Sequence, residues 1–204
     1  MQRIFSFAEQ NLNKYFFGGT VMRELSMTKK LTTMGVMAAL SVILVALVHF
    51  PILPSAAFLE YDPADVPIFL ITFLLGPLYG FILTVVVSLI QGFTVSASGG
   101  MIGIMMHIFA TGTFVWIAGI VYKRNRTRKG AVISLLAGVF AMTLTMCVWN
   151  IIFTPIYSGM PRAAVIAMLP TAIIPFNLLK SGINALLTFI LYKKLSNIVF
   201  KNKE

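Results

Sequence analysis

The chain has 204 residues, of which 58% are hydrophobic and 11% are charged, and its formal net charge is +10. A soluble domain of this size could not bury so much apolar surface, so the composition predicts an integral membrane protein with little room for a separate soluble domain. The positive charge does not indicate nucleic-acid binding, because the basic residues form short clusters at the ends of apolar segments.

Residues 1–30 form a leader before the first apolar segment. The stretch FSFAEQNLNKYFF is compatible with an interfacial amphipathic helix or with a weakly ordered segment, and Met27-Thr-Lys-Lys resembles a natural start. The apolar run after the leader is too long for a signal peptide and lacks a cleavage site. We therefore expect a membrane domain over residues 31–196, followed by a basic tail over residues 197–204.

The first predicted span covers residues 32–50. An acidic loop, residues 55–67, follows it and holds three of the six acidic residues of the chain. A short apolar segment, residues 66–75, is joined to a second one, residues 78–93, by Gly76-Pro77, which marks a tight turn. The short segment has fewer than the about 20 residues that a crossing helix needs, so we expect it to tilt or to lie behind other helices.

The second half of the chain contains three longer apolar segments. Their predicted bounds are residues 101–122, 130–153 and 171–192. A loop over residues 154–170 separates the last two and could carry a short interfacial helix. The sequence thus predicts an all-α integral membrane protein with six transmembrane helices.

Six spans put both termini on one side of the membrane, and the basic residues indicate which side. If both termini are cytoplasmic, fourteen of the sixteen Lys and Arg residues are cytoplasmic as well, and the exceptions are Arg162 and Lys180. This agrees with the excess of Lys and Arg in cytoplasmic loops. The acidic loop then faces outward, beside the outer end of the last span.

Lys180 is the only charged residue in the last span, where a lysine costs about 2.5–3.5 kcal/mol on insertion scales. Asn177 lies on the same helical face, and Asn150 lies at a similar depth in the preceding span. We expect no aspartate deep within a span, and hence no buried carboxylate to neutralise the lysine. We interpret these three residues as a site for a small aromatic ligand with polar edges, with a hydrogen-bonded brace between helices as the alternative.

No catalytic arrangement is visible in the sequence. His49 and His107 lie on separate spans without metal-ligand spacing, and His107 is either a packing residue or part of a pocket lining. There is no ATP-binding motif, and Cys147 is interpreted as a small core residue. We therefore expect no catalytic residue, no metal site and no cofactor.

Gly35 and Ala39 form a step of two small residues, four positions apart, on the first span. Such a step allows another helix to approach closely. The sequence does not decide between a helix of the same chain and a helix of a partner subunit.

Three stretches resemble the substrate-binding S components of energy-coupling-factor (ECF) vitamin transporters. FLEYDPADVPIFLITFLLGPLYG, residues 58–80, resembles their acidic loop and Gly-Pro turn, and residues 103–123 are similar but less distinctive. GMPRAAVIAMLPTAIIPFNLLKSGINALLTFILYKKLS, residues 159–196, is similar to the riboflavin-specific S component, with IPFNLLK as its most specific part.

This resemblance implies a six-helix subunit of the bacterial plasma membrane that captures riboflavin from outside. It would act with a transmembrane coupling subunit and two cytoplasmic ATPases. The resemblance implies that Asn177 and Lys180 bind the flavin, with Asn150 as a further polar position. Leu59 and Glu60 would lie near the ligand in a lid formed by residues 51–65. Gly35 and Ala39 would contact the coupling subunit.

Three other functions are weighed against this one. The same architecture could carry another vitamin, such as pantothenate or folate. An intramembrane enzyme, for example a prenyl-type transferase, would need buried carboxylates or a metal site, and neither is visible in the sequence. A structural scaffold would not explain Lys180 beside Asn177. For the riboflavin function, we expect Lys180→Ala and Asn177→Ala to weaken binding with little loss of folded protein.

Overall fold

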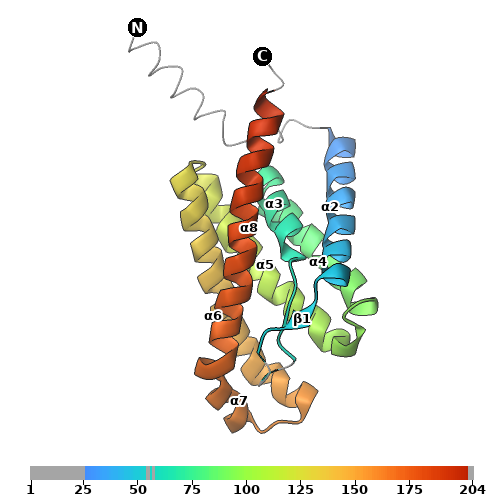
Figure 1. The fold of residues 1–204 in the computed structure, drawn as a ribbon, viewed down its shortest axis with the longest axis vertical. Coiled ribbons are helices and arrows are strands. Elements are labelled where there is room, and N and C mark those ends of the chain that lie inside the picture. Colours follow the sequence, from blue (N-terminus) through green and yellow to red (C-terminus); the bar gives the residue numbers. More distant parts are fainter. Residues whose placement is uncertain (1–25, 54–55, 57, 202–204) are drawn as a thin grey trace.

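The computed structural model describes residues 26–53, 56 and 58–201, so residues 1–25 of the predicted leader and the last three residues of the tail lie outside it. The described part is mostly helical (Figure 1). Within it, four helices are long and apolar enough to cross a membrane, and two shorter apolar helices accompany them.

The elements follow the predicted order. They are α2 (Met27–Leu47), β1 (Phe50–Pro51), β2 (Glu60–Tyr61), α3 (Asp65–Leu75), α4 (Pro77–Phe93), η3 (Ala97–Gly99), α5 (Gly100–Arg124), α6 (Arg128–Ser158), α7 (Arg162–Met168), η4 (Leu169–Ile173) and α8 (Ile174–Lys201). The helix α7 is the short helix expected in the loop before the last span, and the π-helical turn η4 joins it directly to α8.

The helix α6 extends further than predicted. It passes through Pro155 and ends at Ser158, where Gly159 adopts the left-handed conformation with φ of 71°. A proline lacks the N–H of a helical hydrogen bond, and its ring crowds the carbonyl one turn earlier, yet α6 continues through Pro155. The Ser158 hydroxyl donates to the Thr154 carbonyl at 2.7 Å, so the last turn keeps a local partner for that carbonyl. The glycine, rather than the proline, ends the helix.

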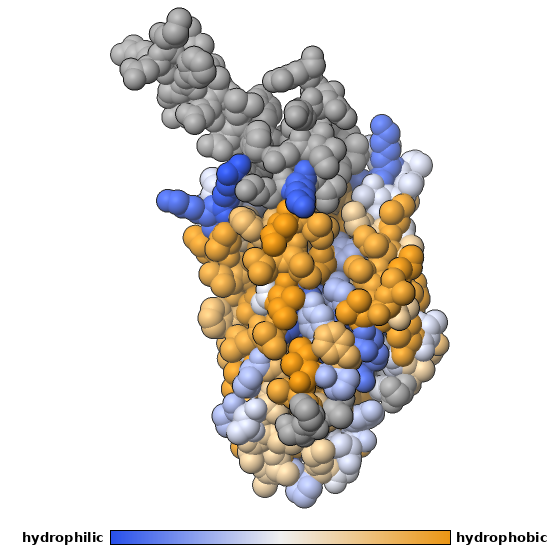
Figure 2. All heavy atoms as spheres, viewed as in Figure 1, coloured by the Kyte–Doolittle hydropathy of each residue, from blue (hydrophilic) through white to orange (hydrophobic). Residues whose placement is uncertain are grey.

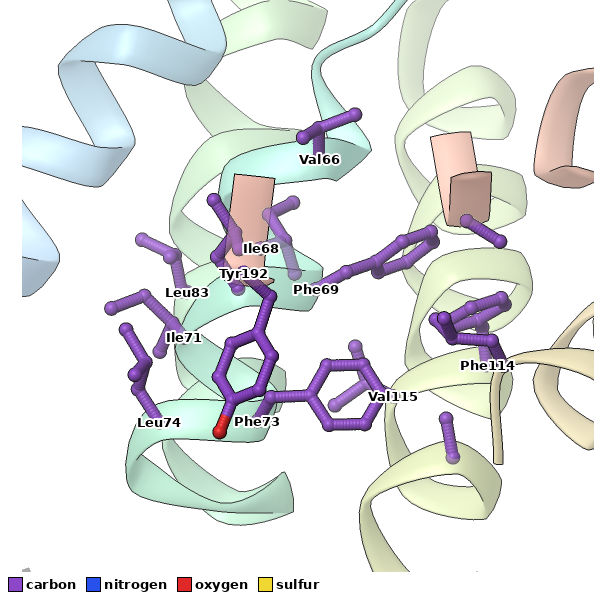
Figure 3. Packing of buried hydrophobic residues seen from close by; sticks show 14 of the residues in the cluster. Val66, Ile68, Phe69, Ile71, Phe73, Leu74, Leu83, Phe114, Val115 and Tyr192 are labelled. Carbon is purple, nitrogen blue, oxygen red and sulfur yellow. The ribbon is translucent and has the colours of Figure 1, made fainter. Parts of the chain in front are cut away.

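The short helix α3 lies at the centre of the bundle. All eleven of its residues are buried, and it packs against α2, α4, α5 and α8. The Phe69 ring stacks on the Phe114 ring of α5 with centroids 3.7 Å apart and an angle of 8° between the planes (Figure 3). The prediction that this segment lies behind other helices is therefore confirmed.

The connection between α3 and α4 is a single residue. Gly76 has φ of 108° and ψ of 172°, a conformation that is essentially restricted to glycine, and Pro77 begins α4. The reversal lets α4 return close to α3. A Cβ atom at Gly80 would overlap the Thr72 hydroxyl and lie 2.9 Å from a methyl group of Val115.

The basic ends of the helices lie together at one end of the bundle. The Lys30 ammonium of α2 lies 5.5 Å from the centre of the Tyr79 ring, which follows the α3–α4 turn. The Tyr122 hydroxyl at the end of α5 and the Tyr192 hydroxyl of α8 are 3.1 Å apart, and Phe73 packs edge-on against Tyr122. Figure 2 shows hydrophilic side chains at this end, bordering a broad hydrophobic surface.

A short hairpin folds the acidic loop back onto the helices. Phe50 of β1 pairs with Tyr61 of β2, and Pro51 pairs with Glu60, in an antiparallel ladder. Two residue pairs are too few to be stable alone, so the hairpin depends on the helices beneath it. It brings the residues after β2 to the N-terminal end of α3.

The close packing of α3, α4 and α5 gives a first prediction. We expect Gly80→Ala to destabilise the protein by about 1–3 kcal/mol, because the added methyl group overpacks a filled site. The measurement is the melting temperature of the detergent-solubilised protein. Gly182→Ala is the matched control, since a Cβ there meets nothing within 4 Å. Equal melting temperatures for the two variants would contradict the packing described for α4.

Candidate functional site

A cavity of about 270 Å³ opens between the helices at the end opposite the basic clusters. Its walls come from the β1–β2 segment, the C-terminal halves of α4 and α6, the first part of α5 and the first part of α8. Its polar lining residues are His49, Glu60, Asp62, Ser88, Gln91, Ser96, His107, Asn150, Thr154, Tyr157, Asn177 and Lys180.

The structure brings together all of the binding residues expected from the sequence. Leu59, Glu60, Asn150, Asn177 and Lys180 line this one cavity. Gly35 and Ala39, the expected partner contact, lie elsewhere, on an exposed face of α2. The residues expected to bind the ligand therefore line the cavity, and the residues expected to contact a partner lie on α2, away from it.

Lys180 forms an ion pair that the sequence analysis did not anticipate. Its Nζ donates to Asp62 Oδ2 at 2.7 Å and to the Glu60 carbonyl oxygen at 3.2 Å, and the Lys180 and Asp62 side chains are 12% and 9% exposed. The expectation that no buried carboxylate neutralises this lysine is therefore wrong. The β1–β2 hairpin carries Asp62, which the sequence analysis assigned to an outer loop, inward against α8.

Asp65 is a second buried carboxylate and is fully inaccessible. It accepts hydrogen bonds from Thr111 Oγ1 at 2.9 Å and from Asn184 Nδ2 at 3.4 Å, and its Oδ1 lies 3.2 Å from His107 Nε2. Asp65 is the first residue of α3, where the helix dipole favours a negative charge. The expectation that no aspartate lies deep within a span fails here, because the first turn of α3 is enclosed by α5 and α8.

His107 combines both roles that the sequence left open. Its Nδ1 lies 2.7 Å from Ser88 Oγ of α4, and its Nε2 faces Asp65, so both ring nitrogens have partners. The same ring lines the cavity. His107 therefore joins α4 and α3 to α5 while it forms part of the cavity wall.

Tyr61 and Asn184 complete the polar network and were missed as site residues. The Tyr61 hydroxyl donates to Asn184 Oδ1 at 3.2 Å, and Asn184 Nδ2 donates to the Asp62 carbonyl oxygen at 3.1 Å. Burial raises the pKa of Tyr61 above its ordinary value of 10.0, so the phenol stays protonated as a donor. The sequence could have indicated Asn184 as a site residue, because it lies four residues after Lys180 on the same face of the helix.

The two predicted amides are buried in the cavity wall. Asn150 donates from Nδ2 to the Met146 carbonyl oxygen at 2.8 Å and accepts a bond from Thr154, and Asn177 donates to the Ile173 carbonyl oxygen at 2.8 Å. These bonds of Asn150 and Asn177 stay local to one stretch of helix, whereas Lys180 links α8 to the segment before α3. The Asn177 carbonyl oxygen accepts a hydrogen bond from the Ser181 hydroxyl at 2.5 Å, one turn further along α8.

The wall of the cavity formed by the β1–β2 segment carries Leu59, Glu60 and His49. Leu59 is 6% exposed, and the Glu60 carboxylate pairs with His49 Nε2 at 2.7 Å. The described residues contain no cluster of three or more His, Cys, Asp or Glu side chains that could hold a metal ion. The cavity offers amides, an ammonium group and carbonyl oxygens around an apolar interior, an arrangement suited to noncovalent binding of a small ligand with polar edges.

The fold and the cavity define a helical membrane protein that binds a small molecule. Comparison with known proteins gives the family. The model of the substrate-specific component of ECF transporters matches residues 29–192, so the chain belongs to this family. A solved S component of a bacterial ECF transporter has the same fold, with a TM-score of 0.75 and 27% identity over 86% of this chain and 99% of that one.

Three relatives from bacteria cover most of the sequence. The riboflavin transporter RibU of Staphylococcus aureus is 29% identical over 87% of this chain and 96% of its own length. The riboflavin transporter RibU of Streptococcus thermophilus is 26% identical over 98% of this chain and 100% of its own length. The riboflavin transporter FmnP of Bacillus subtilis is 25% identical over 82% of this chain and 92% of its own length.

The family assignment identifies a transporter component of a bacterial membrane and not an enzyme. From the sequence, an intramembrane enzyme was disfavoured because neither buried carboxylates nor a metal site was visible. The expectation about carboxylates is wrong, because Asp62 and Asp65 are both buried. The two carboxylates are bound within the protein by Lys180, Thr111 and Asn184. They hold the cavity wall and the lid together.

The buried ion pair changes what is expected of a lysine substitution. We expect Lys180→Met to destabilise the protein by about 3–5 kcal/mol, because the buried Asp62 carboxylate loses its partner. The earlier expectation of little loss of folded protein on removal of Lys180 is revised accordingly. The measurement is the yield and melting temperature of the purified variant in detergent.

The double variant Lys180→Met/Asp62→Asn is the matched comparison. It removes both charges and should recover most of the lost stability. A double variant as unstable as Lys180→Met would contradict the assignment of the loss to an unpaired Asp62.

Proposed function

We propose that the chain is the riboflavin-binding subunit of an ATP-driven ECF importer and that it captures riboflavin at the outer face of the membrane. The observation that carries this proposal is that riboflavin transporters match the chain over 82% to 98% of its length. The cavity supports it, because amides and an ammonium group line an apolar volume.

The ligand chemistry is consistent with these residues. Riboflavin has a flat ring with hydrogen-bonding edges and a hydroxylated side chain. In this proposal Asn177 and Lys180 bind the edge of the ring, and Asn150 is a further polar contact. Leu59 and Glu60 close the cavity from the lid side. No prosthetic group is required, since riboflavin is the transported ligand.

For the topology, we propose six membrane-crossing helices with both termini in the cytoplasm of a bacterium, in a multi-pass plasma-membrane protein. Support comes from the basic residues, which gather at the end of the bundle opposite the cavity. In this arrangement residues 31–196 form the binding domain, residues 197–204 form a cytoplasmic tail, and residues 1–30 are a leader. The cavity then opens to the outside.

For the partners, we propose a transmembrane coupling subunit and two cytoplasmic ATPases. The site proposed for the coupling subunit is the step of Gly35 and Ala39. Both residues are exposed on α2, and a Cβ at Gly35 would meet nothing within 4 Å in this chain. An open stripe of small residues on a lipid-facing helix suits close approach by a helix of another subunit.

Ligand identity is tested by direct binding. Protein purified in detergent after expression in rich medium should be yellow with the absorbance of a flavin, and riboflavin fluorescence should be quenched on titration. Asn177→Leu should weaken riboflavin binding about tenfold, since one hydrogen bond to the ring is lost. Its melting temperature without ligand should stay near that of the wild type, because the lost Asn177–Ile173 bond is local. Colourless protein that does not quench riboflavin fluorescence would contradict the proposal.

The partner contact is tested separately from binding. We expect Gly35→Trp to leave riboflavin binding unchanged and to abolish uptake by the assembled transporter, because the bulky ring blocks close helix approach. Uptake is measured with labelled riboflavin in vesicles supplied with ATP, and assembly is measured by co-purification of the coupling subunit. Leu40→Trp is the control on the same helix, since Leu40 is exposed but lies off the stripe. Normal uptake by Gly35→Trp would contradict the proposed contact.

A further inference from the structure

Gln91 is a buried amide without a hydrogen-bond partner. It lies on α4, is 5% exposed, and lines the cavity. Its Nε2 has no partner among the described residues. A buried N–H group without an acceptor is costly, and such groups are rare in folded proteins. A donor of this kind at a ligand cavity indicates that its acceptor belongs to the ligand.

Two other polar residues on this side of the cavity, Ser88 and His107, already have protein partners. Ser88, one turn before Gln91 on α4, bonds to the Thr84 carbonyl oxygen and to His107. His107 is held on its other side by Asp65. In the described part of the chain, one other buried side-chain atom lacks a partner, Ser41 Oγ of α2, and Ser41 does not line the cavity.

Gln91 lies on a different wall from the predicted ring-binding residues. The helix α4 packs against α2, α3 and α5, whereas α8, which carries Asn177 and Lys180, packs against α3 and α6. A ligand that satisfies both walls needs polar atoms in two separate parts. Riboflavin has this character, with a hydrogen-bonding ring edge and a chain of hydroxyl groups.

We infer that Gln91 is a specificity-determining residue that recognises the hydroxylated side chain of the ligand, by donating a hydrogen bond from Nε2 to one of its hydroxyl oxygens. This inference rests on the proposed riboflavin function. In this arrangement the edge of the flavin ring lies against the wall formed by α6 and α8, and the hydroxylated chain of the flavin lies against the wall formed by α4. Gln91 therefore distinguishes flavins by their side chains rather than by their rings.

The test compares two ligands that share a ring. Lumiflavin carries a methyl group where riboflavin carries the hydroxylated chain. Gln91→Met keeps an unbranched side chain of similar length and removes the donor. We expect it to weaken riboflavin binding about five- to tenfold and to leave lumiflavin binding unchanged, with both measured by fluorescence titration of the detergent-solubilised protein.

A stability measurement separates ligand recognition from a structural role. Without ligand, Gln91→Met should melt at or above the wild-type temperature, because it removes an unpaired buried donor. Ser41→Ala is the matched control: it removes the other unpaired group and should leave both flavin affinities unchanged. A structural role for Gln91 would instead lower the melting temperature of the ligand-free variant, and that result would overturn the inference.

Two outcomes of the binding measurements would contradict the role inferred for Gln91. Equal weakening of riboflavin and lumiflavin, or no weakening of either, would overturn the assignment of Gln91 to the hydroxylated chain. Wild-type protein that binds neither flavin would contradict the proposed function itself, and the assignment of Gln91 with it. The wild-type titration thus tests the function before any variant is compared.

Discussion

Two buried carboxylates at the start of α3, Asp62 and Asp65, are the constraint on which the rest of this fold depends. A charge removed from water is tolerated only if it is paired and hydrogen-bonded. The groups that satisfy these carboxylates come from different elements: Lys180 and Asn184 from α8, and His107 and Thr111 from α5. These bonds therefore fix the β1–β2 segment and the start of α3 in position against the inner face of α8.

The shortness of α3 follows from the same constraint. Eleven helical residues extend about 16 Å, roughly half of the hydrocarbon thickness of a bilayer. On the cavity side, α3 is preceded by the β1–β2 segment and its polar network. Irregular backbone at membrane depth is tolerated where it is buried in protein or lines a cavity. The short helix thus leaves room for the lid and for the cavity beneath it.

The sequence predicts the helices well because their signal is local. Each signal depends on a single segment: a run of apolar residues, the Gly76-Pro77 turn or a basic cluster. For most helices, the bounds in the structure lie within a few residues of the predicted ones. The ends of α6 and α8 are the main exceptions, because α6 continues to Ser158 and α8 to Lys201, beyond the predicted ends at residues 153 and 192. The span predicted for α6 stops at residue 153, whereas the helix continues through Pro155 and ends before the left-handed Gly159.

The ion pair of Lys180 could not be predicted in the same way. Asp62 lies 118 positions earlier in the chain, in a segment whose polarity is typical of an exposed loop. Only the folding of the hairpin over the cavity brings the two groups together. The predicted ligand residues were nevertheless found in one place, because the resemblance supplied long-range information that composition does not contain. Gln91 was visible as a polar residue within a span, but its missing partner is a property of the packed structure.

The ion pair and a ligand role for Lys180 are compatible. An ammonium group has three N–H donors. Two of them are used within the described residues, toward Asp62 Oδ2 and the Glu60 carbonyl oxygen, which leaves one for a ligand atom in the cavity. Lys180 can then hold the lid segment and contact a ligand with the same group. A ligand that accepts the third bond adds to the attachment between lid and α8 without breaking the charge pair.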